Sequence, residues 1–259
     1  MVEYTFSLDK FEIFLLVLVR ISCFIYIAPF FGMTNVLRRV KIGLAVCITV
    51  LVYQFVDTSH IAYAGMISYT VIVLKEGITG LLMGLAANIC NSIILFAGNI
   101  IDMDIGLSMA TEFDPVNNRQ VTVTGNLYFY FIMMLLVVTN MHHVILNALV
   151  DAFSLIPVNG QVFDWEHLAG AFTTYMGDMF VIAFRIMLPV FACIMILNSI
   201  LGIMAKVAPQ MNMFAVGIQL KIIVGFLVLF ITITLLPSIA DMIFTEMRKM
   251  MVLFIEGMY

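Results

Sequence analysis

Long apolar runs separated by short polar breaks dominate this chain of 259 residues. The runs lie at about residues 11–31, 42–56, 61–74, 77–101, 127–150, 180–205 and 214–244. A helix that spans the hydrocarbon of a bilayer needs roughly 20 apolar residues, so the second and third runs are too short to span it alone. The pattern predicts an all-α membrane protein with six to seven long, partly interrupted hydrophobic helices arranged as hairpins.

Residues 1–259 are expected to form a single membrane domain, because no low-complexity tract and no internal repeat divides them. The polar breaks fall mainly at residues 102–126, 151–178 and 206–221. We expect a weak boundary near residue 180, where a last helical hairpin begins. The N-terminal residues are acidic and polar where a signal peptide would be basic, so we expect them to be retained.

The composition supports the membrane class and excludes others. Hydrophobic residues make up 63% of the chain and charged residues 11%, whereas a soluble domain carries about 25% charged residues. The net charge of −4 and the lack of a concentrated basic face argue against nucleic-acid binding. The four cysteines show no metal or redox spacing, and no catalytic motif is present. We therefore expect no enzyme activity, no metal and no cofactor.

Basic residues gather at two of the polar breaks. Arg38, Arg39 and Lys41 follow the first apolar run, and Lys206 and Lys221 flank the last break. Loops rich in lysine and arginine stay on the cytoplasmic side of a membrane. Both breaks are therefore expected to face the cytoplasm.

Arg20 and Arg185 lie inside apolar runs. A charge within the membrane is costly unless it meets water or an opposite charge. One interpretation is that the arginines face an aqueous path. The other, which we favour, is that they form structural ion pairs inside a helical assembly, for example with Glu12, Glu76 or Asp178.

Three glycines follow Glu76 at helical spacing, namely Gly77, Gly80 and Gly84. Small residues three or four apart allow two helices to approach closely in lipid. The spacing predicts a tight helix contact rather than chemistry. Glu76 itself is either a proton carrier or, as we favour, the partner of Lys75 or of another neighbour in an ion pair.

The break at residues 102–126 mixes apolar and acidic side chains and is unusually long for a connection inside a compact domain. A metal site at Asp102 and Asp104 lacks a third ligand at the spacing of a calcium loop. An amphipathic loop that contains glycine suits a mobile plug that seals a pore by apolar contact. The alternative is an exposed connection between helices.

The chain resembles the FliR family of export-gate subunits, which serve the flagellum and have homologues in type III secretion. The likeness is carried by the helix that contains Arg20 and by four stretches of sequence. They are APFFG with RRVKIGLA (residues 28–32 and 38–45), KEGITGLLMGLAAN (75–88), AGNIIDMDIGLSMATEFDPVNN (97–118) and the segment at 188–225.

The resemblance implies a gate in the bacterial inner membrane, within the flagellar basal body, that passes unfolded flagellar substrates. The expected partners are P-type and Q-type gate subunits, an FlhB-type switch protein and an FlhA-type export subunit. Residues 1–179 would be a P-like part and residues 180–259 a Q-like helical hairpin. Whether the system is flagellar or a host-directed injectisome stays open.

The resemblance also assigns residues to roles. Residues 105–124 would form the plug of the pore, with its contacts made by Ile105, Gly106, Leu107, Met109, Phe113, Asp114 and Pro115. The break at 206–221 would form a cytoplasmic tip near the switch protein, through Lys206, Pro209, Gln210 and Lys221.

A small-solute secondary transporter or ion channel is the main alternative, with Arg20, Glu76 and Arg185 lining its path. Such transporters commonly carry inverted repeats with matching broken helices, and none is visible in this sequence. A membrane enzyme would need several ionisable groups at one depth, whereas those of this chain are few and scattered.

Overall fold

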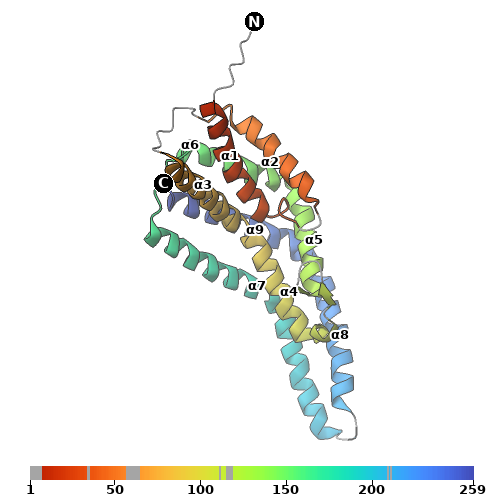
Figure 1. The fold of residues 1–259 in the computed structure, drawn as a ribbon. Coiled ribbons are helices and arrows are strands. Elements are labelled where there is room, and N and C mark those ends of the chain that lie inside the picture. The colour runs from red at the N-terminus through yellow and green to blue at the C-terminus, as the bar shows by residue number, and fades with distance from the viewer. Residues whose placement is uncertain are drawn as a thin grey trace. The chain divides into compact units, whose positions relative to one another are not determined.

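The computed structural model describes residues 8–33, 36–56, 65–110, 112–114, 119–208, 210 and 212–259. Its helices, drawn in Figure 1, are α1 Leu8–Ile27, α2 Arg38–Val52, α3 Met66–Ala87, α4 Ile89–Ile105, α5 Val123–Val138, α6 Met141–Leu155, α7 Trp165–Val207, α8 Met213–Thr232 and α9 Leu236–Glu256. Two short 3-10 helices, η1 Leu107–Ala110 and η2 Ile233–Leu235, interrupt this order. The strands β1 Glu112–Asp114 and β2 Arg119–Val121 form one antiparallel pair. The predicted all-α class is confirmed, with this short hairpin as an addition.

The described chain divides into two compact units, each built from separated stretches of sequence. Unit 1 comprises Met1–Ile89, Asn140–Tyr175 and Glu246–Tyr259, and unit 2 comprises Cys90–Thr139 and Met176–Thr245. Helices α7 and α9 each contribute residues to both units. The division into a P-like part and a Q-like hairpin near residue 180 rests on resemblance and stays a prediction.

Unit 1 is organised around α1, which packs against both α2 and α3. The buried side chains of α1 recur three and four residues apart, as on one face of a helix. They include Ile13, Leu16, Val17, Ile21 and Phe24, none more than 3% exposed. This spacing explains why the first apolar run folds as a helix with a buried face.

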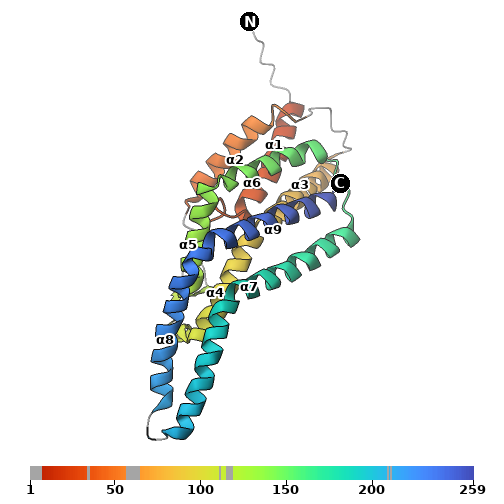
Figure 2. The same ribbon diagram turned by 180° about the vertical axis from the view of Figure 1, so that it is seen from behind.

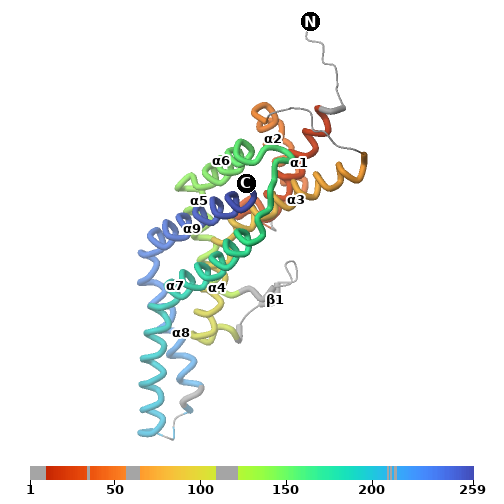
Figure 3. Tube along the Cα trace, turned by 90° about the vertical axis from the view of Figure 1, so that its left-hand side faces the viewer, coloured from red at the N-terminus to blue at the C-terminus, as the bar shows by residue number. Residues whose placement is uncertain are grey.

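Unit 2 contains a long antiparallel hairpin made by α8 and the part of α7 that belongs to this unit. Figure 1, Figure 2 and Figure 3 all show these helices side by side. A Cβ added to Gly217 of α8 would lie 3.4 Å from Leu201 Cδ1 of α7. At the other end of the hairpin, the Phe96 ring of α4 meets Phe180 edge-on, with centroids 4.9 Å apart, a favoured aromatic geometry.

Two helix breaks differ from those expected from the sequence. Helix α3 continues through Lys75 and Glu76, and the break comes at Asn88 instead. The run at 127–150 is not one helix, because Thr139 and Asn140 separate α5 from α6. Asn140 has φ 57°, a left-handed conformation that asparagine adopts more readily than most residues. The expected continuous helix was therefore wrong at this point.

Helix α7 begins 15 residues earlier than the apolar run at 180–205 predicts, so much of the expected break at 151–178 is helical. Asp164 caps its first turn, since its Oδ1 accepts the backbone N–H of Glu166 at 3.0 Å and of His167 at 3.2 Å. A carboxylate that accepts such bonds stabilises a helix N-terminus. The polar residues of the expected break that follow Asp164 therefore belong to the first turns of α7.

Among the described residues, three helical stretches are long and apolar enough to cross a membrane: Met66–Ala87, Trp165–Val207 and Ala215–Glu256. The pair α5 and α6 passes the same test as one interrupted span. In the apolar 18-residue stretch of α7, only 33% is buried within the chain. In the corresponding stretch of Ala215–Glu256, only 22% is buried. These helices therefore leave most of their apolar surface to lipid or to other proteins.

Candidate functional site

Arg20, one of the two arginines predicted to be costly, meets an acidic residue within unit 1. Arg20 Nε, on α1, lies 2.6 Å from Glu76 Oε2, on α3, and both side chains are fully buried. A buried ion pair offsets the loss of hydration only when its geometry is good and its remaining polar atoms are also bonded. Of the candidate partners for Arg20, the structure pairs it with Glu76.

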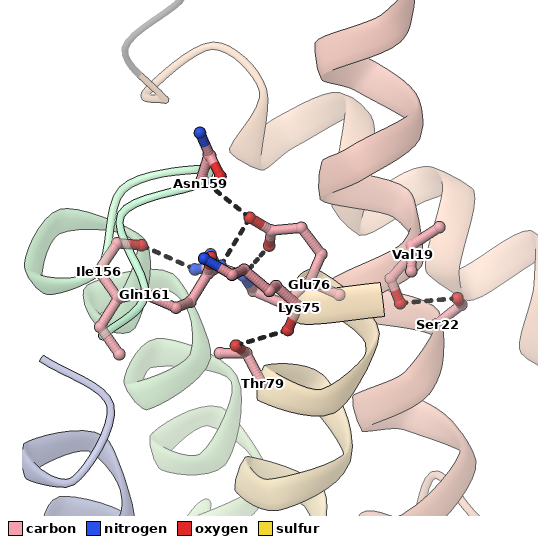
Figure 4. A network of polar contacts seen from close by, with 9 residues as sticks. Val19, Ser22, Lys75, Glu76, Thr79, Ile156, Asn159 and Gln161 are labelled. Carbon is pink, nitrogen blue, oxygen red and sulfur yellow. Dashed lines mark hydrogen bonds and ion pairs between the residues drawn. The ribbon is translucent and has the colours of Figure 1, made fainter. Parts of the chain in front are cut away.

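Glu76 is held by a second set of hydrogen bonds, drawn in Figure 4. Its Oε1 accepts the backbone N–H of Asn159 at 2.9 Å and Nε2 of Gln161 at 2.6 Å. Asn159 has φ 64°, a left-handed conformation that turns the chain sharply between α6 and α7. Both carboxylate oxygens are therefore used, which favours a structural role for Glu76 over that of a proton carrier.

Arg20 is held by the end of α6. Its Nη1 donates to the backbone carbonyl of Ile156 at 2.8 Å. The Phe153 ring lies 4.3 Å from the guanidinium carbon, a distance at which the ring face attracts the cation. The pair thus ties together α1, α3 and residues 153–161, which are far apart in the sequence.

The glycines of α3 allow α1 to come close enough for this pairing. A Cβ on Gly80 would collide with the backbone carbonyl of Arg20 itself. A Cβ on Gly84 would lie 3.1 Å from the carbonyl oxygen of Phe24 and from Cβ of Ile27. The backbone of α1 therefore lies directly against α3 at these positions, and the contact is made within one chain.

The remaining predicted charges lie elsewhere. Arg185 is exposed on α7, so within this chain it is not a buried charge, and its role in assembly stays a prediction. Lys206 and Gln210 are exposed near the turn from α7 to α8, and Pro209 lies outside the described residues. Lys221 lies inside α8 and not in the loop. The helix begins well before it, because the side chain of Asn212 accepts the backbone N–H of Ala215 and caps the first turn.

The first basic cluster also forms part of a helix and not of a loop. Arg38, Arg39 and Lys41 open α2, and Lys41 Nζ donates to the carbonyl of Gly32 at 2.9 Å. Partial burial and the nearby charge of Arg38 lower the pKa of Lys41. The expectation that these basic groups face the cytoplasm stays a prediction.

The described parts of the predicted plug segment, residues 105–110, 112–114 and 119–124, include regular backbone structure. Helix α4 continues through Ile105, and Leu107 and Met109 belong to η1. Phe113 and Asp114 belong to β1, and in the backbone register of its pairing with β2 Phe113 is the partner of Gln120. Gly106 supplies the turn after α4 with φ 91°, a conformation that favours glycine. Pro115 lies outside the described residues.

Ile105 anchors the start of this segment. Its side chain is fully buried, and a Cβ on Gly225 of α8 would lie 2.6 Å from Ile105 Cδ1. Leu107 is half-buried. The apolar contacts at the start of the predicted plug are thus made inside unit 2.

Asp102 has a role that the sequence did not reveal. It is fully buried, and its Oδ1 and Oδ2 accept the backbone N–H of Thr124 at 3.3 and 3.2 Å. Thr122 occupies the N-cap position of α5 but makes no capping hydrogen bond with its side chain. Burial raises the pKa of Asp102, against the opposing effect of its bonds to Thr124 and Val123.

The fold and these contacts define a class: a helical membrane protein whose few internal charges serve structure. Within the described residues, no group of three or more potential metal ligands occurs. The exposed apolar helices are typical of a subunit that other membrane proteins cover. The chain belongs to the bacterial export proteins, family 1, which it matches over residues 11–247.

Similar proteins cover nearly the full chain. The flagellar biosynthetic protein FliR of Bacillus subtilis (strain 168) is 32% identical over 97% of this chain and 95% of its own length. The protein of the same name from Pectobacterium carotovorum subsp. carotovorum is 29% identical over 88% and 87%. That from Escherichia coli (strain K12) is 25% identical over 90% and 89%.

Breaking the buried ion pair from one side should be costly. We expect Arg20→Met or Glu76→Leu alone to lower the free energy of unfolding by about 3–5 kcal/mol, because the other charge stays buried without a partner. The double variant should lose much less than the sum. Thermal and denaturant unfolding of the purified protein measure this, and additive losses would show that the two side chains are not coupled.

Matched alanine substitutions test the helix contact. Gly80→Ala should destabilise the protein by about 1–3 kcal/mol, because the new methyl group meets backbone. Gly77→Ala, one turn earlier, should be neutral or slightly stabilising, since its Cβ would lie 3.7 Å from Cys23 Sγ and Val19 Cγ1. Equal unfolding midpoints for the two variants would contradict the close approach at Gly80.

Proposed function

We propose that the chain is a core subunit of the flagellar protein export gate in the bacterial inner membrane. With P-type and Q-type subunits it forms a plugged pore through which unfolded flagellar proteins leave the cytoplasm. Family membership and the names of its relatives support the flagellar export role. The observation that carries the proposal is the apolar surface that the long helices leave uncovered.

That surface is extensive on the α7–α8 hairpin. The exposed fractions of Ile196 and Ile203 on α7 are 62% and 66%, and that of Phe230 on α8 is 76%. A helix of 43 residues such as α7 follows a path of about 65 Å at 1.5 Å per residue. The bilayer hydrocarbon is only about 30 Å thick. Other subunits of the gate would cover the part of the apolar helix that lies beyond the lipid.

The segment at 105–124 is proposed to be the plug. In the closed state its apolar side chains fill the pore throat, and in the open state the substrate replaces those contacts. A ligand shifts such an equilibrium only by its differential affinity for the two states. The buried position of Ile105 and the glycine turn that follows it support a segment anchored at its base.

The turn between α7 and α8 is proposed to be the cytoplasmic tip that meets the FlhB-type switch protein, with the FlhA-type export subunit nearby. Lys206 and Gln210 are exposed there.

The transporter alternative is less well supported, because Arg20 and Glu76, two of the residues expected to line its path, form a buried ion pair with each other. No catalytic step is needed on this proposal.

The subunit proposal predicts a requirement for partners. Removal of this chain should abolish secretion of flagellar proteins, and the tagged chain should co-purify with P-type and Q-type subunits. Secretion assays and affinity purification from detergent-solubilised membranes measure both. A purified chain that moves a small solute in liposomes without any other protein would contradict the proposal.

The plug proposal predicts a leak. Replacing residues 107–121 with a short glycine–serine linker should make the membrane permeable to ions, because the apolar seal is removed. Growth under salt stress and fluorescent probes of membrane potential report the leak. The same replacement in cells that lack the P-type and Q-type subunits should cause none. A sealed membrane with normal export would show that the segment is not the plug.

A further inference from the structure

Asp102 and Thr124 stand at opposite ends of the plug segment, and they are joined directly. The carboxylate belongs to the last turn of α4, and the N–H it binds belongs to the first turn of α5. The two residues are 22 positions apart in the sequence. Their hydrogen bond therefore closes the base of the intervening segment.

The bond replaces an ordinary helix cap. The first N–H groups of a helix lack partners within the helix, and its N-terminus carries partial positive charge, so a carboxylate is a favourable acceptor. The residue at the N-cap position normally supplies that acceptor. In α5 the side chain of Thr122 does not do so. The first turn of α5 is thus completed by a neighbouring helix.

Two other contacts at the base bring helices together by close packing. A Cβ on Gly98 of α4 would collide with the backbone of Gly125 of α5. Ile105 makes apolar contact at Gly225 of α8. These contacts permit close approach, whereas the carboxylate of Asp102 specifies which turn of α5 is held.

The charged neighbour of Asp102 has a different setting. Asp104 is half-buried, and its Oδ2 has no hydrogen-bond partner among the described residues. Burial raises the pKa of the Asp104 carboxyl, against the opposing effect of the positive charge of Lys221 on α8. Asp102 instead faces the backbone of α5. Asp104 is therefore a matched control: the same residue type, on the same helix, without the bond to α5.

We propose that Asp102 is a positioning residue that clasps α4 to α5 and so holds the base of the plug segment closed. The role of that segment as a plug rests on the proposed function, but the clasp itself does not. What the clasp needs is a buried oxygen acceptor of this size. An amide oxygen meets that need, so asparagine should preserve the clasp and alanine should remove it.

Distance measurements between spin labels test the clasp in the assembled complex. The labels are attached to Met103→Cys on α4 and Leu127→Cys on α5, which are 70% and 43% exposed, after the four native cysteines are changed to alanine. Asp102→Ala should broaden the distance distribution and raise the separated fraction roughly five- to thirtyfold, the usual effect of losing a helix cap. Asp102→Asn and Asp104→Ala should leave the distribution unchanged.

Two results would overturn the clasp: an unchanged distribution in Asp102→Ala, or equal broadening in Asp102→Asn. The membrane leak is measured in the same variants. If Asp102→Ala separates the helices and the membrane leaks, both the clasp and the plug are supported. If the helices separate but the membrane stays sealed, the clasp stands and the proposed plug function fails.

Discussion

Burying one positive charge in an apolar chain constrains much of unit 1. Arg20 is tolerable only because Glu76, the carbonyl of Ile156 and the ring of Phe153 surround it. Bringing those groups together requires α3 to lie directly on α1, which in turn requires a glycine at position 80. One electrostatic demand thus fixes a helix–helix contact and the path of the chain after α6.

Much of the fold followed from the pattern of apolar residues. The runs were long enough to predict helices and too poor in charge to belong to a soluble domain. The pairing of Arg20 with an acidic residue was also predictable, because an unpaired charge is too costly there. The spacing of Gly77, Gly80 and Gly84 predicted a close contact before its partner helix was known.

Other features are not visible in the pattern of apolar runs. The break at Asn140 arises from one backbone conformation, and the early start of α7 from a cap at Asp164. The bond from Asp102 to Thr124 joins residues that only the fold brings together, so no spacing rule could reveal it. The helices whose apolar faces stay exposed are stabilised by molecules outside this chain, which its sequence cannot describe.

The wide separation of the groups around Arg20 has a consequence for biosynthesis. Glu76 follows Arg20 by 56 residues and Ile156 by 136. At roughly 5–20 residues per second, the ribosome delivers Glu76 about 3–11 seconds after Arg20, and Ile156 later still. During that interval α1 carries a cation without its counter-ion. A cation on an apolar helix is costly until it meets water or an opposite charge. The buried contact between α1 and α3 can therefore form only after Glu76 has been synthesised, and it is completed only when Ile156 follows.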